Sequence, residues 1–156
     1  MLKYRPFEMH CHTRHSDGTF LVPQLIESVA AYGYAGLALT DHNAITGLLE
    51  VTEELQRKNN CLVLPGIEWT TFYGHLLVIG CDRFVDWRFV TPDTIDEALQ
   101  EIRAAGGIAG VAHPSEVGSP LMCGCNWEFR VKRWDLMDYV EIWSGPDPHA
   151  SAKNGL

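Results

Sequence analysis

Residues 23–42 read PQLIESVAAYGYAGLALTDH, and this stretch carries the pattern that decides the fold class. Apolar residues at 25, 26, 29 and 30 recur at helical spacing, and Gly33 is typical of the position just after a helix. The apolar run at 36–40 predicts a buried strand, and Asp41 and His42 follow it directly. A helix, then a buried strand with polar residues at its carboxyl end, is typical of an α/β protein.

The same alternation continues on both sides of this stretch. Further strands are predicted at 7–10, 61–67, 75–79, 108–112 and 139–143, the second of them interrupted near its end by Pro65 and Gly66. Helices are predicted at 48–58 and from Thr91, as the N-cap before Pro92, through 105. Residues 114–135 have no clear period, and we expect a long active-site loop there. The pattern predicts a single α/β domain over residues 1–156 with a largely parallel sheet, open or rolled into a barrel.

Composition limits the classes of function. The formal net charge of −8 argues against a surface that binds nucleic acid nonspecifically, because phosphate contacts need clustered Lys and Arg. An anionic substrate remains compatible, since bound divalent cations reverse the local charge of a site rich in carboxylates. The sequence contains no apolar run of about eighteen residues and no signal peptide at its start, so it predicts no membrane span and a cytoplasmic protein.

The five cysteines do not form the pattern of a disulfide framework, which suits a reducing compartment. Cys123 and Cys125 could be half of a zinc site, but the sequence has no matching second pair. We therefore expect structural roles for the thiols.

Histidines and carboxylates gather at predicted strand ends. His10 and His12 end the first strand on one face, because alternate strand residues point the same way. The other candidates lie beside later strand ends or in the loop after the first strand: Asp17, Asp41, His42, Glu68, His75 and His113. Loops at the carboxyl ends of parallel strands converge on one crevice, and nitrogen and oxygen donors suit zinc, manganese or iron. The set predicts a metal centre.

Each candidate also has an ordinary interpretation. His15 and His149 are typical of surface or hydrogen-bonded histidines, and a His-x-His pair alone is a weak signal. Asp41 could be a helix N-cap, Glu68 an exposed strand end, and His113 the end of a strand before Pro114. Only their common placement beside strand ends favours the metal centre.

Five segments in order resemble the successive motifs of the PHP (polymerase and histidinol phosphatase) family. They are HCHTRHSDG at 10–18, TDHN at 40–43, GIE at 66–68, GHLL at 74–77 and AHP at 112–114. The segments EWTTFYGH at 68–75, VDWR at 85–88 and EIW at 141–143 resemble the CehA/McbA-type metallohydrolase branch of that family. The resemblance covers roughly residues 7–145.

The resemblance implies a distorted (β/α)7 barrel that holds two or three divalent ions, Zn, Mn or Fe. It implies that His10, His12 and Glu68 hold the first ion, and that Glu68 bridges to a second ion bound by His75 and His113. Asp17 and His42 would belong to a third position. Glu68 and Asp41 are the predicted catalytic residues, with Asp41 orienting its neighbours.

The family completes its site with a later Gly-Ser-Asp-x-His motif, which this sequence lacks. Asp147-Pro148-His149 has the Asp-x-His spacing but no preceding Gly-Ser, and it directly follows the last predicted strand. We therefore expect a C-terminally truncated chain with an incomplete barrel, and leave open whether Asp147 and His149 substitute for the missing ligands. A missing closing element would leave a sheet edge exposed and invite association.

The predicted reaction is hydrolysis of a small phosphomonoester or nucleotide by metal-activated water. Arg14 or His15 would contact the phosphate or the leaving group, and a solvent-exposed loop position is the alternative for Arg14. Two alternatives stay open: hydrolysis of a carboxylic or carbamate ester at the same site, and a metal-binding structural or interaction module without catalysis. We expect a small phosphoester substrate and no membrane or nucleic-acid partner, whereas the oligomeric state stays undetermined.

Overall fold

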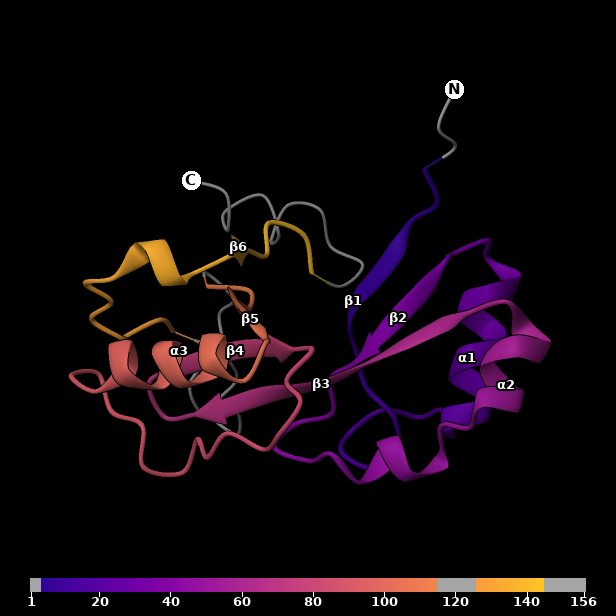
Figure 1. Ribbon diagram of the computed structural model, residues 1–156, viewed down its shortest axis with the longest axis horizontal. Coiled ribbons are helices and arrows are strands. Elements are labelled where there is room, and N and C mark those ends of the chain that lie inside the picture. Colours follow the sequence, from indigo (N-terminus) through magenta and orange to yellow (C-terminus); the bar gives the residue numbers. More distant parts are fainter. Residues whose placement is uncertain (1–3, 115–125, 145–156) are drawn as a thin grey trace. The chain divides into compact units, whose positions relative to one another are not determined.

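A computed structural model describes residues 4–114 and 126–144, and the chain divides into two units, Met1–Glu68 and Trp69–Leu156 (Figure 1). Among the described residues, six strands lie in the sheet in the same order as in the sequence, from β1 (Phe7–Cys11) to β6 (Tyr139–Val140). Strands and helices alternate, so the predicted α/β class is confirmed. Of the four strand pairs with a described register, three are parallel, as expected of a largely parallel sheet, whereas β4 (Gly74–Ile79) and β5 (Ile108–Val111) run antiparallel.

The first unit is built on three parallel strands, β1 (Phe7–Cys11), β2 (Gly36–Leu39) and the first part of β3 (Leu62–Thr71). Gly36 must be a glycine, because a Cβ there would lie 2.3 Å from the carbonyl oxygen of Leu62. At the far end of the β1–β2 pair, the Thr40 hydroxyl accepts the Cys11 N–H and donates to the Cys11 carbonyl. This tie fixes where β1 ends.

Helix α1 (Val22–Ala31) covers the first unit's strands with the apolar face that the sequence pattern predicts. Its three buried residues are Val22, Leu25 and Ile26, which pack in one core with apolar residues of the strands: Leu37, Leu39, Cys61 and Val63. Gly33 adopts a φ of 86° just beyond the helix, a conformation that glycine reaches without steric cost. The expected helix end is confirmed.

The helix predicted at 48–58 is wrong as a single element. The structure has a short 3-10 helix, η1 (Thr46–Glu50), and then helix α2 (Glu53–Asn59). The break follows from Thr52, whose hydroxyl accepts the Leu55 N–H at 3.1 Å and so caps a new helix start. Asn60 ends α2 in the left-handed conformation.

The predicted interruption of the third strand at Pro65 and Gly66 is also wrong. Strand β3 runs through both residues for ten residues in all. Pro65 stands opposite Leu39, the last residue of β2, where the regular ladder between the two strands ends. Its missing N–H is thereby tolerated, as is typical of proline at the margin of a sheet. Glu68 consequently lies inside a strand and not at its end.

In the second unit, β5 lies between β4 and β6 (Tyr139–Val140), and it is parallel to β6. Gly110 of β5 lies against the Tyr139 ring, since a Cβ at Gly110 would come within 2.2 Å of that ring. Strand β6 ends earlier than the predicted residue 143. Beyond one more backbone bond from Glu141 to Val111, the apolar Ile142 and Trp143 are largely exposed.

Helix α3 (Ile95–Ala104) begins later than the sequence predicts. Thr91 is not the N-cap: its N–H donates to the Thr94 hydroxyl in a turn that precedes the helix. The acidic first turn is therefore Asp96 and Glu97. The helix buries a stripe at helical spacing, Ile95, Ala98, Leu99 and Ile102.

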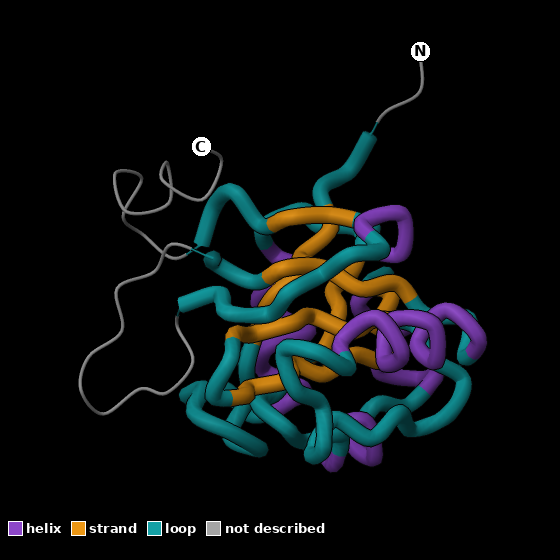
Figure 2. Tube along the Cα trace, turned by 90° about the vertical axis from the view of Figure 1, so that its left-hand side faces the viewer, coloured by secondary structure: helices purple, strands orange, loops and turns teal. Residues whose placement is uncertain are grey.

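Loops make up much of the described chain (Figure 2), and residues 80–94 hold no helix or strand. Within the predicted loop at 114–135, the described residues 126–133 are also irregular, and a 3-10 helix, η2 (Trp134–Leu136), follows at its end. No helix among the described residues has both the length and the apolar character needed to cross a bilayer.

Candidate metal centre

The carboxylate of Glu68 is the centre of the candidate site in the first unit. Glu68 is fully buried, with 0% of its surface exposed. The Glu68 carbonyl accepts the Asn43 N–H at 2.9 Å, and the Glu68 N–H donates to the Asp41 carbonyl at 3.2 Å. These two bonds continue the parallel pairing beyond the end of β2. This pairing places His42 directly opposite Glu68. Backbone hydrogen bonds therefore align Asp41 and His42 with Glu68.

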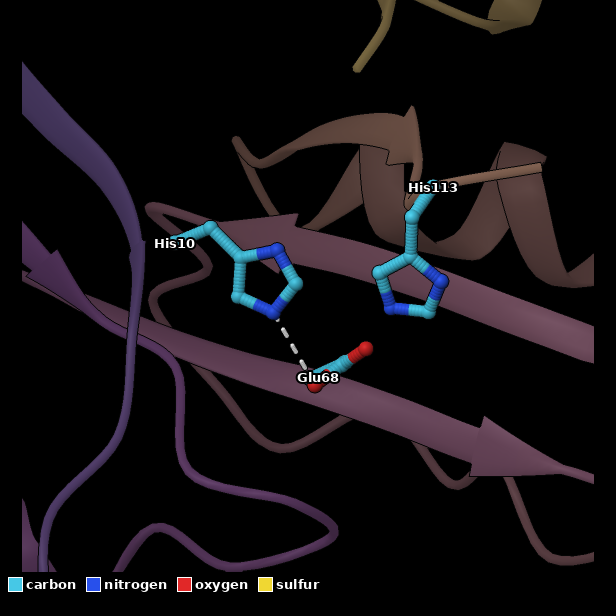
Figure 3. A group of neighbouring side chains, drawn as sticks. All are labelled: His10, Glu68 and His113. Atoms are coloured by element: carbon cyan, nitrogen blue, oxygen red, sulfur yellow. Dashed lines mark hydrogen bonds and ion pairs between the residues drawn. The ribbon is translucent and has the colours of Figure 1, made fainter. Parts of the chain in front are cut away.

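Three imidazole nitrogens surround one oxygen of that carboxylate. His10 Nε2 lies 3.1 Å from Glu68 Oε2, as the dashed line in Figure 3 marks. His12 Nε2 lies 3.3 Å and His42 Nδ1 2.9 Å from the same oxygen. His113, also drawn in Figure 3, belongs to the second unit.

The histidines contact one another as well as Glu68. The Nε2 atoms of His10 and His12 are 3.1 Å apart, so the two residues do reach one point, as their alternate positions predict. The His12 and His42 rings stack, with centroids 4.4 Å apart and planes 15° from parallel. His12, His42 and Glu68 each offer a ligand atom within 4.8 Å of the others.

Asp17 lies at the exposed edge of this group. Its carboxylate oxygens are 3.4 Å from His42 Nε2 and 3.8 Å from His12 Nδ1, and its side chain is 65% exposed. Asp17 sits in a loop that folds back on Thr13, whose carbonyl accepts the N–H groups of Ser16 and Gly18. The loop thus brings a second carboxylate to the two histidines.

Burial and charge move two imidazole pKa values in opposite directions. Burial lowers the pKa of His12 despite the opposing charge of Glu68, and positive charge on His10 and His42 lowers it further. Burial also opposes protonation of His42, but the hydrogen bond and charge of Glu68, with the charge of Asp17, outweigh it and raise the pKa. A neutral His12 is the form that binds a metal ion.

Asp41 holds the loop after β1 in place. It is 1% exposed, and its carboxylate accepts the Thr13 N–H at 2.7 Å, the Thr13 hydroxyl at 2.7 Å and the Ser16 hydroxyl at 2.6 Å. These bonds occupy the carboxylate with the His12–Asp17 loop rather than with a helix N-terminus. The alternative interpretation as a helix N-cap is therefore wrong.

Arg14 and His15, the two residues predicted to contact substrate, form hydrogen bonds with other parts of the protein. Arg14 Nε donates to the Thr19 carbonyl at 2.9 Å. His15 joins the loop to η1, with Nδ1 2.8 Å from the Thr46 hydroxyl and Nε2 2.7 Å from Glu50 Oε1. Their roles in substrate binding stay predictions.

The second unit brings His75 and His113 together. Both are buried, and their rings meet edge to face with centroids 5.0 Å apart. His75 lies at the start of β4 and His113 just after the end of β5, and the Ala112 N–H donates to the His75 carbonyl at 3.1 Å. Antiparallel pairing is the reason that a strand start meets a strand end here.

His113 has an unusual backbone. Its φ is 25°, which is rare for a residue with a side chain, and its N–H donates to Glu141 Oε2 at 2.9 Å. Such strain persists where surrounding contacts enforce it, and it is common at functional sites. The Glu141 contact supplies one such restraint.

Sequence reasoning missed the residues that support the ligands. Thr13, Ser16 and Glu141 had no assigned role, yet they fix Asp41 and His113. Hydroxyls inside the 10–18 segment were the available signal for the first two, because Ser and Thr in loops commonly bond neighbouring carboxylates and backbone. Asp147, His149, Cys123 and Cys125 lie outside the described residues.

The donor set fits a divalent cation. A buried carboxylate needs positive charge nearby, and imidazole nitrogens with carboxylate oxygens are the ligands that zinc, manganese and iron accept. His12 Nδ1 is buried without a hydrogen-bond partner, so this ring has capacity for a further contact. A cation among these groups would satisfy both.

Comparison with known proteins points in one direction. The family model described as the PHP domain matches residues 8–105. The chain is 34% identical to a 3′,5′-nucleoside bisphosphate phosphatase of Chromobacterium violaceum over 79 residues, 48% of this chain and 27% of that protein. It is 22% identical to the 5′-3′ exoribonuclease Rnm of Escherichia coli over 129 residues, 72% of this chain and 44% of that protein.

Among solved structures, a candidate metal-dependent phosphoesterase of Bifidobacterium adolescentis matches with a TM-score of 0.62 and 17% identity. The match covers 97% of this chain and 82% of that one, and it supports the similarity of fold. The curated relatives are matched over less than half of their own length.

Proposed function

Because the chain belongs to the PHP domain family, we propose that it forms the site of a metal-dependent phosphoesterase acting on a small phosphomonoester or nucleotide. The observation that supports this most is the fully buried Glu68 carboxylate contacted by three imidazole nitrogens at 2.9–3.3 Å. The phosphatase from Chromobacterium violaceum supports the choice of a phosphate ester.

The residues proposed to hold two or three divalent ions, Zn, Mn or Fe, are the predicted set: His10, His12, Asp17, His42, Glu68, His75 and His113. Bound cations supply positive charge for phosphoryl oxygens and activate water near neutral pH. The assignment of Glu68 as a carboxylate shared by two ions comes from the family resemblance and stays a prediction, as does the closed (β/α)7 barrel.

The chain's own groups have separate tasks in this proposal. The imidazoles must be neutral and Glu68 ionised to bind cations, and the lowered pKa of His12 favours its neutral form. Asp41 positions the loop that carries His12 and Asp17 through its bonds to Thr13 and Ser16. Arg14 and His15, in that loop, are proposed to orient the phosphate or the leaving group.

The test combines metal content with hydrolysis. Elemental mass spectrometry of the purified chain is expected to find at least two ions, with loss of metal in His10→Ala/His12→Ala and retention in a control, Tyr32→Ala, which changes an exposed residue at the end of α1. At most one ion per chain, unaffected by His10→Ala/His12→Ala, would contradict the proposed centre.

A substrate panel then separates the chemical alternatives. The metal-loaded chain is expected to hydrolyse p-nitrophenyl phosphate faster than p-nitrophenyl acetate or a p-nitrophenyl carbamate. Faster acetate or carbamate hydrolysis would favour a carboxylic or carbamate esterase, whereas bound metal without turnover would favour a non-catalytic module. The cytoplasmic location and the absence of nucleic-acid partners also stay predictions.

A further inference from the structure

A hollow of about 410 Å³ lies wholly within the second unit, and no part of the proposed metal centre lines it. Its walls come from the turn that joins β3 to β4 and from the irregular segment before α3. The lining residues are Thr70, Thr71, Phe72, Tyr73 and residues 87–91. Its volume falls within the range of small-molecule sites, roughly 300–1,000 Å³.

The wall formed by the β3–β4 turn is held by its own hydrogen bonds. The Thr71 hydroxyl accepts the Tyr73 N–H at 3.0 Å and donates to the Gly74 carbonyl at 2.8 Å. The Tyr73 ring meets the Phe129 ring edge to face, with centroids 5.9 Å apart. These contacts fix the turn before any ligand arrives.

The opposite wall is a turn as well. The Val90 N–H donates to the Trp87 carbonyl at 3.1 Å, and the Thr91 N–H donates to the Thr94 hydroxyl at 2.9 Å. Both walls are therefore shaped by hydrogen bonds between the backbone and threonine hydroxyls, and the second also by one between backbone groups. A preformed hollow binds a rigid ligand with a small loss of conformational entropy.

Aromatic side chains dominate the lining. Phe72, Tyr73, Trp87 and Phe89 all contribute, and Phe72 and Phe89 are 77% and 82% exposed. Large apolar side chains that stay in water beside a hollow are typical of a binding surface. A flat ring would stack on them and remove them from water.

The charge of the hollow favours a neutral ligand over a free anion. Arg88 lines it, but its guanidinium is bound to Asp86 by two hydrogen bonds, Nε to Oδ1 at 2.9 Å and Nη2 to Oδ2 at 2.6 Å. The hydrogen bond from Arg88 lowers the pKa of Asp86 to about 2, so the pair is charged but balanced at neutral pH. The guanidinium carbon lies 5.9 Å from the Phe89 ring centroid and extends the flat surface.

Arg88 also supplies polar recognition at the edge of a ring. A guanidinium has five N–H donors, and the two bonds to Asp86 use two of them. The nitrogen and carbonyl acceptors of a heteroaromatic ring match such donors, while its faces match the phenyl and indole groups. A hydrocarbon ring would use the faces alone.

We propose that this hollow binds the nucleobase of a nucleoside or nucleotide. The turn that forms one wall leads directly into β4, whose second residue is the proposed ligand His75. If the hollow binds the base of the substrate, the inference rests on the proposed function, because that substrate would then be a phosphoester that carries a nucleobase. Binding of the base itself does not depend on catalysis.

The test uses adenosine, which has no phosphoester to be hydrolysed, and the full chain as purified. Isothermal titration calorimetry is expected to detect binding, weakened at least about tenfold in Phe72→Ala/Phe89→Ala. The matched control is Phe84→Ala, a half-exposed phenylalanine of the same unit that does not line the hollow, and it is expected to bind as the parent does. Far-UV circular dichroism verifies that each variant is folded.

Two further ligands decide what is recognised. Benzyl alcohol is expected to bind more weakly than adenosine, and equal binding would overturn recognition of a base. A triadenylate that competes with adenosine would identify the end of a single strand as a second source of the same ring, and absence of competition would restrict the site to mononucleosides. No adenosine binding, or binding unchanged in Phe72→Ala/Phe89→Ala, would overturn the inference even if the chain hydrolyses phosphate esters.

Discussion

The two units hold their histidines in different ways. In the first, His10, His12 and His42 surround the buried carboxylate of Glu68, and parallel backbone pairing aligns the last of them with it. In the second, His75 and His113 meet edge to face across an antiparallel pair.

The difference is one of charge. A buried carboxylate costs several kcal/mol unless positive charge compensates it, so the first group needs protons or cations to be stable. His75 and His113 contribute imidazole nitrogens, which bind a metal ion as neutral donors and bring no negative charge to it. We therefore expect the first unit to dominate metal affinity, and the second to add to it.

The largest effect is expected for Glu68→Gln, which keeps the shape of the side chain and removes its charge. Metal-dependent phosphatase activity should fall by about a thousandfold or more, because the oxygen shared by three imidazoles loses its charge. The measurement is kcat/KM for p-nitrophenyl phosphate together with metal content. The control is Glu27→Gln, an exposed carboxylate of α1 that pairs with Lys58 at 3.5 Å. Equal activity in the two variants would refute the central role of Glu68.

The next largest effect is expected when two histidines are removed from one unit, compared with two removed from the other. His12→Ala/His42→Ala should lose more metal than His75→Ala/His113→Ala, because His12 Nε2 and His42 Nδ1 lie 3.3 and 2.9 Å from Glu68 Oε2 and Asp17 lies beside the same two rings. Isothermal titration calorimetry with the metal ion measures the affinity of each double variant. Equal losses would show that the charge of Glu68 does not set the order, and a greater loss from the second pair would reverse the comparison.

A smaller effect is expected for Asp41→Asn, which leaves every proposed ligand intact. The amide oxygen can still accept the Thr13 N–H and the Ser16 hydroxyl, but an NH2 replaces the oxygen that accepts the Thr13 hydroxyl and the negative charge is lost, so stability should fall by about 1–3 kcal/mol. Metal affinity should fall by about 10–100-fold as the loop carrying His12 and Asp17 loosens. Denaturant titration and metal binding test this against Asp82→Asn, an exposed carboxylate beside Arg83. Unchanged metal affinity would show that Asp41 supports the fold alone.

The smallest effect concerns the break between η1 and α2. Thr52→Ala should destabilise the first unit by about 1 kcal/mol, since the Leu55 N–H loses its capping partner. Thr52→Ser keeps the hydroxyl and should restore most of this loss in denaturant titrations followed by circular dichroism. If serine and alanine behave alike, the cap does not stabilise α2.

Local patterns were sufficient to predict most of the elements. The apolar spacing of α1, the left-handed Gly33 and the short buried β2 all follow from neighbours in sequence, and the structure confirms them. The same reasoning failed at Pro65, because a proline is tolerated opposite the last residue of the facing strand, and that depends on where β2 ends. It failed at Thr91 and Thr52 because several residues nearby could cap a helix, and their small free-energy differences decide between them.

What the sequence by itself determined is the chemistry: which residues can ligate metal, and that they lie in or beside the strands of an α/β chain. It also carried the family resemblance, which the match of residues 8–105 to the PHP domain confirms. Only the tertiary structure decided the burial of Glu68 inside β3, the use of Asp41 to hold a loop, and the antiparallel pairing that joins His75 to His113. The physical reason is that residue type is a local property, whereas burial and hydrogen-bond partners are set by segments far apart in the chain.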